Sequence, residues 1–211
     1  MRSLTLINQS GISYVVVGGF AVVMHGVNRF TPDLNVVVSF EEAPLKRLFE
    51  LFTSSELLPS DSTMVDQFLA PPLREKLLPE QKKRFLSFYD HQAPPFRVDF
   101  FTAHPIDFEK LYSDRDVVSV GSQELSLCSL SDLLLLKEIA HRGQDQADCD
   151  QLKVIQSLRS EGFSPEGLES AYPEFSKEHL RALSEFHALP ASQKLDWLLE
   201  MLTHLGQFCV L

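Results

Sequence analysis

The feature that most constrains this chain is a glycine pair between a strand-forming run and a helix-forming run. The segment YVVV, residues 14–17, is aromatic and β-branched and predicts a buried strand. Gly18 and Gly19 end it, and FAVVMH continues with apolar residues at helical spacing until Gly26. Glycines at the start of a helix let exposed backbone N–H groups approach a phosphate. The sequence therefore predicts a strand–turn–helix unit suited to phosphate binding.

The next strand carries polar residues at regular spacing. It begins at Asp33, directly after Pro32, which cannot donate to a sheet ladder. Asn35 follows two residues later, and side chains two apart on a strand point to the same face. A further strand, predicted over 96–101, carries Asp99. Since Mg²⁺ prefers oxygen ligands, these three residues are candidates to converge on one ion.

These residues resemble the first motif of the DNA polymerase β-type nucleotidyltransferase superfamily. That motif is a glycine pair, an Asp-x-Asp strand and a later carboxylate, and the matching positions here are Gly18, Gly19, Asp33, Asn35 and Asp99. The context of Arg29, Thr31 and Asp33 is more similar to the AbiEii-type and MenT-type toxin branch. The later segment SLSDLLLLKEIAHRGQDQADCDQL also resembles that branch, through Lys137, Arg142, Asp145 and Asp148. The resemblance covers residues 12–158 with an unaligned middle part.

The resemblance implies an enzyme that transfers a nucleoside monophosphate from a nucleoside triphosphate to an acceptor, with two Mg²⁺ ions held by Asp33, Asn35 and Asp99. By the same resemblance, the catalytic residues are Asp33, Asn35, Asp99, Lys137 and Asp148, and the nucleotide-binding residues are Gly18, Gly19, Arg29, Thr31 and Arg142. A tRNA acceptor and a cognate antitoxin protein are the partners that the toxin branch implies.

Position 35 departs from this pattern, because the resemblance implies an aspartate there. The asparagine offers one neutral carbonyl oxygen and cannot bridge two ions as an anion does. Metal ions contribute several kcal/mol of transition-state stabilisation, so the change predicts weaker metal binding and slower chemistry in an intact fold. The sequence leaves open whether Asn35 is natural or an engineered inactivating change, and with it whether the chain is an active enzyme.

Each of these residues also has a purely structural interpretation. The glycine pair is compatible with an ordinary tight turn, and Asp33 with a solvated strand end. Lys137 is compatible with the polar edge of its helix, and Asp145 and Asp148 with a solvated helix face. The combination nevertheless favours a site, because Asp99 stands between apolar neighbours, where a buried carboxylate needs a partner.

Three functions fit these observations. The first is metal-dependent transfer to RNA by a toxin-like protein. The second is a catalytically impaired member of the fold that binds a nucleotide or a partner protein, which Asn35 favours. The third is transfer to a small molecule of the antibiotic type. The net charge of -10 repels nucleic acid on average and suits a cationic acceptor, while the basic run at 82–84 is either an RNA contact or a solvated stretch.

The order of the predicted elements indicates an α/β (α+β) fold, with a nucleotidyltransferase-type mixed sheet flanked by helices over 1–127 and a helical part over 128–211 packed on it. Residues 54–94 are predicted to be loops, with a short helix near 64–69 and a strand near 85–89.

Three cysteines without CxxC spacing indicate reduced thiols, and the apolar runs are too short for a signal peptide or a membrane span. We therefore expect a cytoplasmic protein without a membrane partner.

Overall fold

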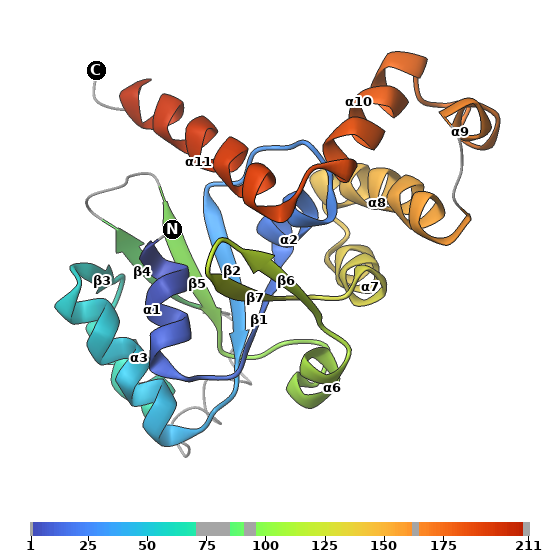
Figure 1. Cartoon of the computed structure of the whole chain (residues 1–211). Helices are drawn as coiled ribbons and strands as arrows, with labels where there is room; N and C mark the ends of the chain where they lie inside the picture. Colours follow the sequence, from blue (N-terminus) through green and yellow to red (C-terminus); the bar gives the residue numbers. More distant parts are fainter. Residues whose placement is uncertain (1, 71–84, 91–95, 162–164, 209–211) are drawn as a thin grey trace.

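The computed structural model describes residues 2–70, 85–90, 96–161 and 165–208 (Figure 1). The strands are β1 (Tyr14–Val17), β2 (Asp33–Val38), β3 (Leu57–Pro59), β4 (Phe85–Asp90), β5 (Arg97–Phe101), β6 (Asp116–Val120) and β7 (Gln123–Leu127). The helices are α1 (Arg2–Ser10), α2 (Gly18–His25), α3 (Glu42–Ser54), α4 (Ser62–Leu69), α6 (Phe108–Ser113), α7 (Leu130–Ala140), α8 (Gly143–Glu161), α9 (Pro165–Ala171), α10 (Lys177–Ala188) and α11 (Ala191–Phe208).

The described strands form one seven-stranded sheet in the order β3-β4-β5-β2-β1-β7-β6. The sheet is mixed, because β2 runs antiparallel to β1 and parallel to β5, and β1 runs parallel to β7. Helices α1 and α3 lie together on one side, while α2 lies with α7, α8 and α11 on the other (Figure 1). These features confirm the predicted mixed sheet flanked by helices and the predicted helical C-terminal part.

Strands β2 and β5 begin with side chains that alternate between polar and apolar. Leu34 of β2 and Phe100 of β5 are fully buried, and Phe52 of α3 packs on Phe100 with ring centroids 5.5 Å apart. Because successive side chains of a strand point to opposite faces, Asp33 and Asp99 lie on the face away from α3. The face of β2 and β5 towards α3 thus holds apolar core residues, and the opposite face carries polar residues where these two strands begin.

One prediction for residues 54–94 is wrong, since Leu57–Pro59 forms an edge strand that pairs antiparallel with β4. Three residues are too few to show strand alternation, and proline is tolerated at a sheet edge, so the sequence carries no clear signal for β3. The predicted strands at 14–17, 85–89 and 96–101 and the predicted helix at 64–69 begin and end within about two residues of β1, β4, β5 and α4. The basic run at 82–84 and the loop at 91–95 lie outside the described residues.

The helical part is anchored at the end of α2. Gly26 adopts a φ of 119°, and a Cβ at this position would lie only 2.7 Å from the Cα of His187 on α10. His25 Nε2 donates to the carbonyl of Cys128 at 2.7 Å, and Arg159 of α8 donates to its Nδ1 at 3.0 Å. Burial lowers the pKa of His25 to about 4, so the neutral imidazole bridges two segments of the chain.

Buried side chains of the sheet and of the C-terminal helices form one continuous core. The division of the chain at residues 127 and 128 therefore stays a prediction. Among the described cysteines, Cys128 and Cys149 are buried and free, and Cys209 lies outside the described residues. None of the described helices has the length and apolar character needed to cross a bilayer.

Candidate functional site

The predicted carboxylates come together on the polar face of the sheet because β2 and β5 are parallel neighbours. Their register pairs Asn35 with Asp99 and Asp33 with Arg97. On the other side of β5, β4 places Ser87 opposite Asp99. Asp99 is 1% exposed and accepts hydrogen bonds from Ser87 Oγ at 2.6 Å and from Arg97 Nε at 3.0 Å. We refer to Asp33, Asn35, Arg97 and Asp99 as the strand cluster.

Both carboxylate oxygens of Asp33 accept hydrogen bonds from neighbouring side chains. Thr31 Oγ1 donates to Asp33 Oδ1 at 2.7 Å, and Asn35 Nδ2 donates to Asp33 Oδ2 at 3.1 Å. A guanidinium nitrogen of Arg97 lies 3.6 Å from Asp33 Oδ2. The single positive charge of Arg97 thus lies between the carboxylates of Asp33 and Asp99.

The glycine pair lies directly against these residues. Gly18 has a φ of 69°, and a Cβ there would lie 3.0 Å from Asn35 Nδ2. A Cβ on Gly19 would lie 2.5 Å from Thr31 Oγ1 and 2.9 Å from a guanidinium nitrogen of Arg29. Val17 makes no capping hydrogen bond through its side chain at the start of α2. The close approach explains why position 19 holds glycine, and it brings the start of α2 beside Arg29 and Thr31.

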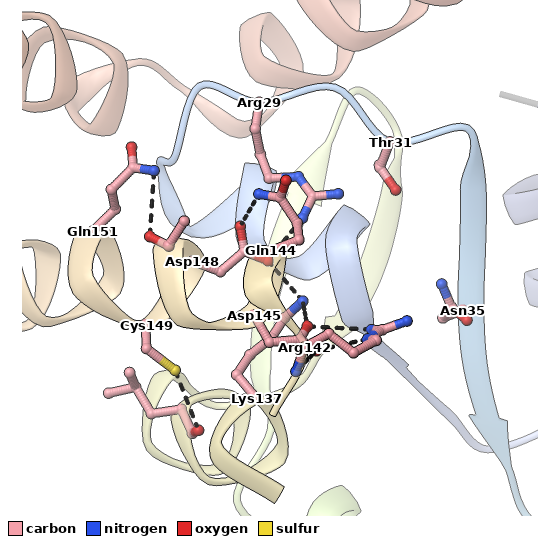
Figure 2. A network of polar contacts seen from close by, with 12 residues as sticks. Arg29, Thr31, Asn35, Lys137, Arg142, Gln144, Asp145, Asp148, Cys149 and Gln151 are labelled. Carbon is pink, nitrogen blue, oxygen red and sulfur yellow. Dashed lines mark hydrogen bonds and ion pairs between the residues drawn. The ribbon is translucent and has the colours of Figure 1, made fainter. Parts of the chain in front are cut away.

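A second polar cluster is buried between α7 and α8 (Figure 2). The Nζ of Lys137 lies 2.9 Å from Asp145 Oδ1 and 2.7 Å from Asp148 Oδ2, and Arg29 donates to the same Asp148 oxygen at 2.7 Å. Lys137 is 5% exposed and Asp148 is fully buried, so these residues are not solvated helix faces. Buried charges need partners of opposite sign, which this cluster provides. We refer to Arg29, Lys137, Arg142, Asp145 and Asp148 as the helix network.

Arg142 is the exposed member of the helix network. Its Nε donates to Asp145 Oδ2 at 2.7 Å, while its side chain is 75% exposed. Burial alone would raise the pKa of Asp145, but hydrogen bonds from Arg142 and Lys137 outweigh it and lower the pKa to about 2. The pKa of Arg142 is raised, first by its hydrogen bond to Asp145 and also by the charge of Asp33. Figure 2 shows Arg142 extending from the network on the side of Asn35 of β2, and its charge interacts with that of Asp33.

The strand cluster, as arranged, does not fit a magnesium centre. It offers two carboxylates and one neutral amide, every carboxylate oxygen already has a donor, and Arg97 supplies a positive charge between them. Within the part of the chain that the structure describes, no three His, Cys, Asp or Glu side chains are grouped to hold a metal ion. The predicted assignment of Asp33, Asn35 and Asp99 to two Mg²⁺ ions is therefore at odds with the hydrogen bonds that these residues make.

The structure brings the predicted site residues into two adjacent groups and adds residues that the sequence analysis missed. Arg97 could have been found, because it precedes Asp99 by two residues and so shares its face. Ser87 could not, because its position depends on the pairing of β4 with β5. Gln144, which donates to Asp148 Oδ1 at 3.2 Å, also carries no distinctive signal in the sequence.

A scan against protein-family models found no match, and a search of curated proteins also found none. Among solved structures, the chain is similar to the crystal structure of the lincosamide antibiotic adenylyltransferase LnuA bound to lincomycin. The identity is 13% and the TM-score 0.47, over 72% of this chain and 92% of that one. A similarity of this size does not bear on activity, which has to be argued from the residues of this chain.

Proposed function

We propose that this chain is a protein of the nucleotidyltransferase type that binds a nucleoside triphosphate at the Gly18-Gly19 turn. We further propose that it transfers the nucleotide slowly or not at all, because Asn35 stands where the resemblance implies a metal-binding aspartate. The phosphates would lie at the start of α2, and the exposed guanidinium groups of Arg97 and Arg142 would face them.

The observation that carries this proposal is the close approach of Arg29 and Thr31 to Gly19. Backbone N–H groups at a helix start, together with the helix dipole, favour a bound anion. A guanidinium group adds donors whose planar geometry matches phosphate oxygens. Gly19 lets Arg29 and Thr31 lie directly against the start of α2, since any side chain at position 19 would collide with them.

The local charge balance opposes an anion less than the charge of the whole chain does. The chain as a whole carries a net charge of -10, which repels phosphates at long range. The two clusters together are balanced, with four carboxylates (Asp33, Asp99, Asp145 and Asp148) and four cations (Arg29, Arg97, Lys137 and Arg142). Of the cations, Lys137 is held inside by two aspartates, so the three arginines are the groups placed to meet phosphates.

Nucleotide binding is tested with labelled ATP, GTP, CTP and UTP in equilibrium dialysis. We expect at least one of them to bind the unchanged chain, and Gly19→Ala to weaken its affinity at least about tenfold, or about 1.4 kcal/mol. Gly143→Ala is the matched control, because a Cβ at Gly143 meets nothing within 4 Å. Absence of binding by all four nucleotides, or equal affinity in the Gly19→Ala variant, would contradict the proposal.

Active nucleotidyl transfer is a second candidate function, favoured by the retention of Asp33, Asp99, Lys137 and Asp148 in one region. Its test is incorporation of labelled nucleotide into total RNA, including tRNA, and into a panel of cationic antibiotics, with Mg²⁺ present. We expect little or no labelling by the unchanged chain and more by Asn35→Asp. Labelling of RNA would favour a toxin-like protein with an antitoxin partner, and labelling of a small molecule would favour the antibiotic-type reaction. Strong labelling by the unchanged chain would show that transfer is not impaired.

A further inference from the structure

We propose that Arg97 is a built-in cation of the strand cluster, which takes the place of a divalent ion between Asp33 and Asp99 and keeps such ions from binding there. The proposal concerns the same site as the proposed function but not nucleotide binding, because it is tested without nucleotide.

The backbone places Arg97 in this position. In the parallel register of β2 and β5, Arg97 pairs with Asp33, and it precedes Asp99 by two residues on the same face. Its Nε lies 3.0 Å from Asp99 Oδ2, and another guanidinium nitrogen lies 3.6 Å from Asp33 Oδ2. A guanidinium group stays protonated at all physiological pH values, so this charge is permanent.

The neutral side chain of Asn35 suits a cluster in which Arg97 is the cation. Its Nδ2 donates to Asp33 Oδ2 at 3.1 Å, the same oxygen that faces Arg97. An aspartate at this position would place a second carboxylate at that distance, and like charges so close disfavour each other unless a cation joins them. With asparagine at position 35, one guanidinium group leaves the cluster with a net charge of minus one, whereas aspartate would leave minus two.

A divalent ion would therefore have to displace existing donors. Thr31 and Asn35 occupy the oxygens of Asp33, and Ser87 and Arg97 occupy those of Asp99. Of these donors, only Arg97 carries charge, so its repulsion of the ion is the largest obstacle. The neutral amide of Asn35 and the positive charge of Arg97 both oppose binding of a divalent ion. Replacing only one of them should therefore restore little ion binding.

The test is Mn²⁺ binding, followed by electron paramagnetic resonance without nucleotide, in four proteins: the unchanged chain, Asn35→Asp, Arg97→Gln and the double variant. We expect no binding below millimolar Mn²⁺ in the unchanged chain, weak binding in each single variant, and at least about tenfold tighter binding in the double variant than in Asn35→Asp alone. Two results would each overturn the proposal: micromolar binding by the unchanged chain, or equal binding by Asn35→Asp and the double variant.

Two further variants control for charge and folding. Arg181→Gln with Gln156→Glu makes the same changes of charge on exposed helix surfaces, and it should bind no more Mn²⁺ than the unchanged chain. If Arg97→Gln does not fold, as judged by circular dichroism, Arg97→Met removes the positive charge and keeps an unbranched side chain. Asn35→Asp combined with Arg97→Met should then bind Mn²⁺ more tightly than Asn35→Asp alone, and equal binding would count against the role of Arg97.

Discussion

The strand cluster and the helix network are built from the same kinds of residue, yet they differ in burial. In the helix network, Asp145 and Asp148 are at most 1% exposed, and each is contacted by two cationic side chains. In the strand cluster, the side chains of Asp33 and Arg97 are 21% and 39% exposed. The carboxylates of the helix network are thus both buried, whereas in the strand cluster Asp99 is buried and Asp33 and Arg97 are open to a ligand.

This difference assigns distinct roles to the two clusters. Charges removed from water are costly unless they are paired, so the helix network holds α7, α8 and the segment before β2 in one arrangement. Partly exposed ion pairs contribute little to stability, so the pair of Asp33 with Arg97 can exchange its contacts at low cost, whereas Asp99 is buried. We infer that the helix network fixes the position of Arg29, while the strand cluster and Arg142 face the ligand.

The largest expected effect follows from Asp148→Asn in the helix network. This change removes the charge that pairs with both Lys137 and Arg29 in the interior, and breaking such a pair costs about 3–5 kcal/mol. Urea denaturation measures the free energy of unfolding. Asp150→Asn, two residues further along α8, is the matched control and should cost less than about 0.5 kcal/mol. Equal costs at the two positions would show that full burial of Asp148 adds nothing to the stability that its charge provides, compared with the partly exposed Asp150.

A smaller loss of unfolding free energy is expected from Asp145→Asn. Its dependence on pH tests whether the ionised form of this buried carboxylate stabilises the fold. The pKa of Asp145 is lowered to about 2 from its ordinary value of 3.8, so its ionisation stabilises the fold by about 2–3 kcal/mol. That stability is present above pH 3.8 and is lost as the pH falls through 2. The destabilisation by Asp145→Asn should therefore be the same at pH 7 and pH 5, measured as a difference in unfolding free energy.

The unchanged chain and the Asp145→Asn variant should both become less stable as the pH falls from 6.5 to 4. Burial lowers the pKa of His25 to about 4, so the unfolded chain binds a proton in this range that the folded chain does not. The slope is at most about 1.4 kcal/mol per pH unit and cancels in the difference. A difference that shrinks from pH 7 to pH 5 would contradict the assignment of Asp145 as a strongly stabilised carboxylate.

The smallest effect is expected from Asp33→Asn, the same chemical change made in the strand cluster. The side chain of Asp33 is partly exposed, and an amide can still accept the hydrogen bond from Thr31. The free energy of unfolding should change by less than about 1 kcal/mol. A cost similar to that of Asp148→Asn would mean that the strand cluster also serves the fold.

Local spacing predicted the strand cluster better than the helix network. The convergence of Asp33, Asn35 and Asp99 follows from the two-residue period of strands together with a family resemblance. The burial of Lys137 does not follow from its spacing, because a lysine after four leucines is equally compatible with the polar edge of a helix. Its environment depends on the packing of α7 against α8, which is a tertiary contact.

Dependence on tertiary contacts also explains why the sequence predicted neither Ser87 in the site nor the strand β3. The place of Ser87 in the site depends on the register of β4 with β5, and β3 is a three-residue edge strand that forms only because β4 offers it a partner. Pairings between strands are long-range contacts that a single sequence does not display. Strand and helix bounds were predictable within about two residues because they depend on local patterns of apolar residues, glycine and proline.

Binding of phosphates at the start of α2 can be observed by nuclear magnetic resonance of the glycine amides. The chain contains nine glycines, so a sample labelled with ¹⁵N in glycine alone gives few signals. On titration with the nucleoside triphosphate that binds, we expect the signals of Gly18 and Gly19 to shift most and those of Gly11 and Gly121 to stay in place. Binding that leaves Gly18 and Gly19 unshifted would contradict the account and place the nucleotide elsewhere on the protein.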